Sequence, residues 1–480
     1  MKQTDWKIVY TSYTGAEKHA VNLLSKETGR NLIRKKGEYR LHVLPCEKEG
    51  CQVPVNGFFV GCYNESKVIK NYVKADEVPE NGYLVKVIKN PDNEEGRFVI
   101  LTAHSKEEVF YAAVSFLDDY VPQHAPRFAV NPMPDWLYDK PLPECSYTEV
   151  SDNKTRSIFT WGHSTNNFRE YIDNMARQKF NELVLWNDYI PVNIEDIIDY
   201  AHSYGIKVVL GYSWGWKEIA KKATSITPGE IEKVKELSIA EYVNNYSAIN
   251  CDGIYFQSFT ERKDNTIEQG KIAKVVTDMV NDIAAKLWEI TPDLRIIFGL
   301  HASSVRNELD IIEKVNPRME ILWEDCGDLP YNYETTIESE ETFAEAIEFT
   351  KKLLNLRGGK GVGLAFKGVM MLNWDNFIYQ PGPYVMGENS PEIADHDRAV
   401  RTKAWKIYSA EWLKSGKYAH EMFKVIKENK LGEVNMCMAG TFDGGIYFPV
   451  ALCAQMFRNC DEDYQKIVEN VMRRECVNVE

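Results

Sequence analysis

The chain lacks long apolar runs and any excess of positive charge. No segment approaches the roughly 18 to 20 apolar residues that cross a bilayer, and the formal net charge is −14 over 480 residues. An acidic chain without a basic tract is a poor partner for nucleic acid or for an anionic membrane surface. Met1 to Tyr13 also lacks a basic region followed by an apolar core, so we expect no signal peptide and a cytoplasmic location.

Spaced cysteine and histidine motifs are missing as well. The ten cysteines show no C-x-x-C spacing, and neither H-x-x-x-H nor E-x-x-H occurs. We therefore expect free thiols in a reducing compartment, with no disulfide framework, no metal site and no cofactor. Tryptophan, in contrast, is abundant: there are 11. Tryptophan offers a flat apolar surface on which a sugar ring can stack, although it is also ordinary core material.

The length of the chain predicts two or three domains. Residues 1–121 read as a small α/β domain, with strand-like runs at 6–10, 39–44, 57–60, 83–89 and 97–102 and helical patterns at 14–28 and 106–120. Six prolines between residues 122 and 143 predict an extended connector, which we place at 122–150. We expect a catalytic domain over 151–394 and a mostly helical C-terminal region over 395–480.

Short apolar runs alternate with helical patterns from residue 156 onward, which predicts parallel strands joined by right-handed crossovers. Seven such strands are readable. The predicted fold is therefore an α/β (β/α)8 TIM barrel, with residues 434–438 as the candidate eighth strand. The seven readable runs are 158–161, 183–186, 207–212, 253–256, 295–300, 320–323 and 369–374.

Polar and aromatic residues follow these strands, at the face where barrel enzymes keep their active sites. Two glutamates at strand ends, Glu261 and Glu324, are the candidate catalytic residues, because glycosyl transfer to water needs two carboxyl groups flanking the anomeric carbon. Glu182 and Glu195, in contrast, read as helix or barrel-bottom charges. The candidate substrate-binding residues are Arg156, Trp161, His163, Trp186, Asn187, Asp188, Trp214, His301, Asp325, Asn373, Trp374 and Asp375.

Several of these candidates have structural explanations of equal weight. Trp186 and Trp214 fit core packing as well as a sugar platform, and His163 and His301 fit buried structural histidines. Glu261 stands in Thr-Glu-Arg-Lys-Asp-Asn, a sequence that also suits a solvated loop. The constellation is therefore more informative than any single residue.

The whole chain resembles a group of glycoside hydrolases. Arg97–Tyr120, with Phe110-Tyr111-Ala112-Ala113, resembles part of the α/β domain that precedes the barrel in family 20 hexosaminidases and family 67 α-glucuronidases. Thr155–Phe159 is similar to the entry to their first barrel strand. Ile321-Leu322-Trp323-Glu324 and Val369–Tyr379 are similar to late strands of family 67, which the domain order resembles most.

This resemblance implies hydrolysis with inversion, in which Glu261 is the acid and Glu324, with Asp325, the base. The chain departs from both families. Thr260-Glu261 stands where family 20 has Asp-Glu, and His301-Ala302-Ser303 stands where family 67 has a further Asp. A uronic acid would need a cation in the pocket, for which Arg156, Arg262 and Lys367 are the candidates.

Three functions remain open from the sequence. The first is an exo-acting glycosidase for small oligosaccharides or glycosides, for which we expect the N-terminal domain to help form a pocket. The second is a substrate-assisted β-N-acetylhexosaminidase, in which Asp188 or Asp325 orients the acetamido group. The third is a carbohydrate-binding barrel without catalysis. The sequence leaves the oligomeric state open, a homo-oligomer included.

Overall fold

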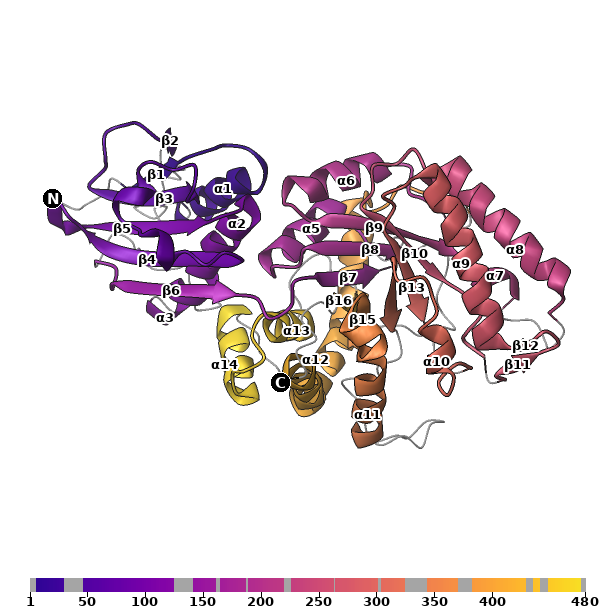
Figure 1. Ribbon diagram of the computed structural model, residues 1–480. Helices are drawn as coiled ribbons and strands as arrows, with labels where there is room; N and C mark the ends of the chain where they lie inside the picture. The colour runs from indigo at the N-terminus through magenta and orange to yellow at the C-terminus, as the bar shows by residue number, and fades with distance from the viewer. Residues whose placement is uncertain are drawn as a thin grey trace.

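A computed structural model describes most of the chain (Figure 1). An N-terminal α/β sheet domain leads into a barrel, and C-terminal helices lie beside both. The described residues are 6–29, 46–124, 141–160, 165–186, 189–219, 226–262, 264–300, 304–323, 343–369, 382–428, 435–440 and 448–475.

The N-terminal domain is built on a six-stranded sheet. Its spatial order is β2 (Cys46–Lys48), β1 (Trp6–Tyr10), β3 (Asn56–Cys62), β5 (Asn93–Ala103), β4 (Gly82–Asn90) and β6 (Cys145–Val150). The first four are parallel, whereas β4 runs antiparallel to β5 and β6. The segment 122–150, predicted as a connector, therefore contributes an edge strand, because the alternating side chains of β6 pair with β4.

Helices α1 (Gly15–Gly29) and α2 (Lys106–Ser115) contact each other and pack against this sheet. The side chain of Ser105 caps α2 by accepting a hydrogen bond from the backbone of Glu108. The helix continues through a π-helical turn (Phe116–Tyr120) into α3 (Val121–His124). Short helical turns, η2 (Ile69–Asn71) and η3 (Ala75–Glu77), connect β3 to β4.

Eight parallel strands form a closed barrel, which confirms the predicted fold class. Seven predicted strands are present. The seventh begins at Val362, before the predicted 369–374, because Val362 and its neighbours continue the ladder from β14, and residues 370–374 lie outside the described residues. The eighth strand pairs with both β15 and β7, so the barrel extends past residue 394, where the sequence placed its end. The strands are β7 (Arg156–Thr160), β8 (Glu182–Trp186), β9 (Lys207–Ser213), β10 (Gly253–Gln257), β13 (Ile296–Leu300), β14 (Met319–Trp323), β15 (Val362–Val369) and β16 (Asn435–Gly440).

Helices surround the barrel, and the described helices beyond it form the C-terminal region. Thr227 and Glu230 form a reciprocal capping box at the start of α8. A small hairpin, β11 (Thr266–Ile267) with β12 (Gly270–Lys271), precedes α9. The helices are α5 (Phe168–Arg177), α6 (Ile194–Ser203), α7 (Trp216–Ile219), α8 (Pro228–Glu241), η6 (Tyr242–Tyr246), α9 (Ile272–Ile290), α10 (Leu309–Ile312), α11 (Phe343–Leu354), η7 (Leu356–Gly359), α12 (Pro391–Glu428), α13 (Phe448–Arg458) and α14 (Tyr464–Glu475).

Charged side chains close the amino-end side of the barrel. Arg295 donates to both carboxylate oxygens of Glu320 at 2.8 Å and also pairs with Glu182, whose other oxygen accepts from Ser157 at 2.7 Å. Burial alone would lower the pKa of Arg295, but the two carboxylates raise it well above its usual range. This cluster ties four strand starts together and places Glu182 at the barrel bottom, one of the two positions expected for it.

The N-terminal domain contacts the barrel through turns that precede barrel strands. Asp118 of the N-terminal domain binds Arg177 at the end of α5 with two hydrogen bonds of 2.6 and 3.0 Å. His19 on α1 contacts Ser203 at the end of α6 at 2.8 Å. These turns lie on the amino-end side of the barrel, because each leads into a strand. The described contacts therefore put the N-terminal domain away from the strand carboxyl ends, contrary to the expectation that it helps form a pocket there.

A second contact joins all three parts of the chain. Glu149 on β6 accepts two hydrogen bonds from Arg458 at the end of α13, at 2.6 and 2.7 Å, and one from Lys179, at 3.3 Å. Lys179 precedes β8 and also donates to the hydroxyl of Tyr83 at 2.5 Å.

No described helix, including the 38-residue α12, combines the length and apolar content needed to span a bilayer.

Candidate active site

Four of the predicted site residues fall within the described parts of the chain, namely Arg156, Trp186, Trp214 and Glu261. The structure allows their positions to be compared with the carboxyl-end face of the barrel. The other ten lie outside the described residues: Trp161, His163, Asn187, Asp188, His301, Glu324, Asp325, Asn373, Trp374 and Asp375.

Arg156 lies on the amino-end side of the barrel, opposite the face on which substrate is expected. It is the first residue of β7, is 4% exposed, and donates to the carbonyl oxygens of Lys179 at 2.7 Å and Asn153 at 2.8 Å. Its guanidinium also lies 5.7 Å from the ring centre of Tyr111 on α2. Because Arg156 lies at the start of its strand and not at the end, it is too far from the expected substrate face to be a ligand. It instead contacts the N-terminal domain.

Trp214 packs outside the barrel wall. The side chain is fully buried and stacks on Phe256 with ring centres 3.7 Å apart, while Phe256 stacks in turn on Phe298. Since Phe256 and Phe298 face the helical layer, Trp214 is core material there. Its expected role as a platform for a sugar is therefore not supported by its placement.

Trp186 lies inside the barrel, at the carboxyl end of β8. It is 4% exposed and packs edge-on against Tyr255, with ring centres 5.5 Å apart. Gly211, its register partner on β9, leaves the room it needs, because an added Cβ would come within 2.6 Å of the indole. Trp186 and Tyr255 thus fill the upper layer of the barrel interior, beneath the strand-end face.

Gln257 ends β10 at the same face and is absent from the predicted substrate ligands. Its amide donates to the hydroxyl of Tyr255 at 3.0 Å, and its residue is 5% exposed. The alternation of β10 points Tyr255 and Gln257 to the same side, into the barrel. That alternation is the sequence signal by which Gln257 could have been selected.

Glu261 is an exposed residue on an anchored loop. The three residues before it, Ser258 to Thr260, are buried. The carbonyl oxygen of Thr260 accepts hydrogen bonds from the backbone nitrogen of Ser304 at 3.3 Å and from its hydroxyl at 2.6 Å. The loops that follow β10 and β13 are therefore fastened together next to Glu261. The side chain of a glutamate on such a loop can contact a bound molecule while the loop backbone stays in place.

A groove lies between the loop that follows β8 and helix α8. Its volume of about 640 Å³ is within the range typical of sites for small ligands. Glu218 in α7 accepts a hydrogen bond from the hydroxyl of Ser213 at 3.1 Å, and Glu241 lies at the end of α8. Burial raises the pKa of Tyr212 well above its usual value, so this phenol stays neutral and donates to the carbonyl of Ser238 at 3.1 Å.

The groove-lining polar residues on α8 and the turn after it were missed by sequence reasoning. In the sequence, Glu241, Asn244 and Asn245 have the pattern of an ordinary solvent-exposed helix face. Nothing in their spacing shows that other residues lie across a groove from them. The residues across the groove include Tyr189, which is 41% exposed. Together they offer hydroxyl, amide and carboxylate groups, the partners that sugar hydroxyls use. Glu261 is not among the residues that line this groove.

Among the residues that the structure describes, one group of side chains is arranged as metal ligands could be. It consists of Glu17, Cys62 and Glu65 in the N-terminal domain. This domain contacts the barrel on its amino-end side, away from the strand carboxyl ends. The group therefore does not belong to the candidate active site.

No protein-family model and no curated protein sequence matches the chain. Among solved structures, a family GH115 4-O-methyl-α-glucuronidase, BtGH115A, described as specific for decorated arabinogalactans, is similar over 99% of this chain. The TM-score is 0.51 at 12% identity, and the match covers 60% of that protein, so the chain spans little more than half of its length.

Two further structures are CpGH84D, with a TM-score of 0.47 at 14% identity over 88% of this chain and 69% of that one, and CpGH89 from Clostridium perfringens in complex with GlcNAc-α-1,4-galactose. The latter has a TM-score of 0.44 at 9% identity, and the match covers 83% of this chain and 47% of that chain. These two scores are too low to support an argument. The expected resemblance to glycoside hydrolases is confirmed in the fold, which this chain shares over nearly its whole length with a family GH115 α-glucuronidase.

Proposed function

We propose that this protein is a glycoside hydrolase that removes terminal sugars from small oligosaccharides or glycosides. In this proposal Glu261 is the general acid, and Glu324 is the general base or nucleophile. One observation carries it: Glu261 is an exposed residue on an anchored loop at the carboxyl-end face of a closed eight-stranded barrel. The similarity in fold to an α-glucuronidase over 99% of this chain is further support.

The chemistry needs a proton donor for the departing glycosidic oxygen and a second carboxylate on the other side of the sugar. Glu324 directly follows β14, as Glu261 follows β10, and only β13 lies between these two strands in the barrel. The groove beside β9 supplies polar groups for the hydroxyls of a substrate. The remaining substrate contacts that the sequence predicts, His163, Asn187, Asp188, His301 and Asn373 among them, belong to this proposal.

The test is hydrolysis of a panel of aryl glycosides by the wild-type chain and by Glu261→Gln. The panel contains α-glucuronides with and without the 4-O-methyl group, β-N-acetylglucosaminides and simple hexosides. Loss of a general acid lowers the rate by roughly 10²- to 10⁴-fold. The loss should be larger for a phenyl glycoside than for a nitrophenyl glycoside, because the weaker leaving group depends more on protonation.

Glu268→Gln is the matched control, since Glu268 is an exposed carboxylate in the hairpin that follows the same loop. It should leave the rate unchanged. If Glu261→Gln lowers hydrolysis of both leaving groups equally, Glu261 is not the acid. A different result would favour a carbohydrate-binding protein without catalysis. In that case no glycoside is cleaved, and calorimetry detects sugar binding that is unchanged in Glu261→Gln.

Two further readouts of the same assay separate the mechanisms. NMR of the first-formed anomer distinguishes inversion from retention. Cleavage that strictly requires a 2-acetamido group would instead favour the substrate-assisted hexosaminidase.

A further inference from the structure

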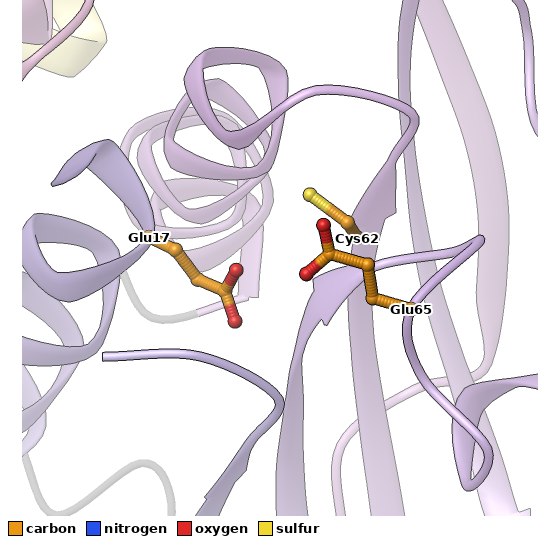
Figure 2. A group of neighbouring side chains, drawn as sticks. All are labelled: Glu17, Cys62 and Glu65. Atoms are coloured by element: carbon orange, nitrogen blue, oxygen red, sulfur yellow. The ribbon is translucent and has the colours of Figure 1, made fainter. Parts of the chain in front are cut away.

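Glu17, Cys62 and Glu65 bring three metal-ligand atoms together in the N-terminal domain, far from the groups that the proposed function uses. One carboxylate oxygen from each glutamate and the sulfur of Cys62 lie within 4.8 Å of one another. Figure 2 shows both carboxylates and the thiol facing a common space between α1 and the end of β3. Glu17 lies in the first turn of α1, and Cys62 is the last residue of β3.

The backbone around the three side chains is firmly held. The carbonyl of Cys62 accepts hydrogen bonds from the backbone of Glu65 at 3.1 Å and of Ser66 at 3.0 Å, so Cys62 and Glu65 sit in one tight turn. The backbone of Ser12 donates to one oxygen of Glu17 at 2.6 Å. These contacts fix the directions in which two of the three ligands point before any ion binds.

The incomplete hydrogen bonding of Glu17 indicates that its carboxylate binds a ligand. The residue is fully buried, yet its second carboxylate oxygen, Oε2, has no hydrogen-bond partner. A buried carboxylate oxygen without a partner costs free energy, and native structures rarely leave one so. Burial raises the pKa of Glu17 to about 7, against the opposing effects of the Ser12 backbone and Lys106.

The surrounding charge favours a cation over an anion. Glu17, Glu65 and Glu107 all act on Cys62 as negative charges, opposed by Lys106. The ammonium of Lys106 is bonded to the hydroxyl of Thr14 at 2.7 Å instead of to Glu17. Gly61, next to Cys62, permits this close approach, because an added Cβ would meet the hydroxyl of Thr11 at 2.1 Å and Glu17 at 3.3 Å.

We propose that Glu17, Cys62 and Glu65 bind one zinc ion, with water as the fourth ligand. A thiolate with two carboxylates selects a borderline-soft transition metal over magnesium or calcium, which prefer oxygen alone. In a tetrahedral zinc site the ligand atoms lie roughly 3.3 to 3.6 Å apart, as bond lengths of about 2.0 and 2.3 Å require. The three ligand atoms lie within 4.8 Å of one another, so they must approach by up to roughly 1.2 to 1.5 Å on binding. The exposed Glu65 side chain is free of packing and can make its part of this movement. On binding, the thiol proton of Cys62 is released to water as the sulfur–zinc bond forms.

A zinc ion there would join the first turn of α1 to the turn after β3. Because the site forms only in the folded domain, zinc would stabilise the protein by mass action. This role is separate from glycoside hydrolysis, and it holds whether or not the chain cleaves a sugar.

The test uses the full-length protein, freed of metal with a chelator and then titrated with cobalt(II) as a spectroscopic stand-in for zinc. We expect one ion per chain and a near-ultraviolet thiolate-to-cobalt absorption that zinc removes. Cys62→Ser should abolish this absorption, and Glu65→Gln should weaken zinc binding at least about tenfold. Zinc should raise the melting temperature of the wild-type chain but not of Cys62→Ser.

Cys460→Ser is the matched control, because Cys460 is equally buried and burial raises its pKa to about 12, as it does for Cys62. Its metal binding should equal that of the wild type. Since Glu65 is exposed, Glu65→Gln remains informative even if Cys62→Ser does not fold. Absence of thiolate absorption at stoichiometric cobalt, or zinc affinity unchanged in Glu65→Gln, would overturn the proposal.

Discussion

Replacing Glu149 by glutamine should destabilise the whole protein, because this carboxylate holds its three parts together. The change keeps the shape of the side chain and removes its charge. It leaves two cations, Arg458 at 3% exposed and Lys179 at 2%, without the anion that both contact. Burial alone would raise the pKa of Glu149, but Arg458 and Lys179 outweigh it and hold the pKa well below its usual range.

The expected cost is about 3 to 5 kcal/mol, the usual effect of removing one partner from a buried ion pair. That is a large part of the roughly 5 to 15 kcal/mol by which most domains are stable. Because the folded-state pKa of Glu149 lies below its unfolded value of 4.5, its stabilisation is present at neutral pH. It is lost as the pH falls below about 4.5, so acid should narrow the gap between variant and wild type.

Urea unfolding, followed by tryptophan fluorescence and circular dichroism, measures this effect. Glu144→Gln is the control from the residue just before β6, since its contact with Lys89 is 3.7 Å long and both side chains are more than half exposed. It should change the free energy of unfolding by less than about 1 kcal/mol. If Glu149→Gln costs no more than Glu144→Gln, the buried cluster does not join the domains as described.

Two smaller predictions concern other sites. Gly211→Ala should cost about 1 to 3 kcal/mol, measured by urea unfolding, because the added methyl group overpacks the barrel interior against Trp186. Gly229→Ala is the control, since Gly229 is exposed, has open space around it and has no positive φ. In the presence of a chelator, Glu17→Gln should gain stability relative to the wild type as the pH rises from 4.5 through about 7. Above pH 4.5 the unfolded wild type carries the Glu17 charge in water, whereas the folded wild type must carry it buried. This lowers the free energy of unfolding of the wild type by up to about 3 kcal/mol, and the glutamine variant avoids the loss. A pH-independent difference would contradict the burial of Glu17.

The barrel could be predicted because its strands are short apolar runs between helical patterns. The start of the seventh was placed too late, since glycines at 358, 359, 361 and 363 made the start of β15 read as a turn. β6 was missed because the proline-rich stretch before it suggested an extended connector, and only its pairing with β4 makes Cys145–Val150 a strand.

The direction of a side chain was harder to predict than the strand that carries it. Trp186 points into the barrel, whereas Trp214 points out of it. These directions depend on the strand register, because a shift of one residue would turn each side chain to the other face. Arg156 shows a related problem, because a residue near a strand can lie at either end. Cys62 lies 45 positions after Glu17, a separation that no local motif could reveal.

The closure of the barrel by β16 has a consequence for how the protein is made. The register partner of Arg156 on β7 is Met436, about 280 residues later in the chain. At ribosomal speeds of about 5 to 20 residues per second, β7 waits roughly 14 to 56 s for its second neighbour. During that time it presents an unpaired strand edge, the kind of surface on which chains aggregate. The yield of soluble protein should therefore depend on what shields this edge during synthesis, which is a property of the folding route and not of the finished barrel.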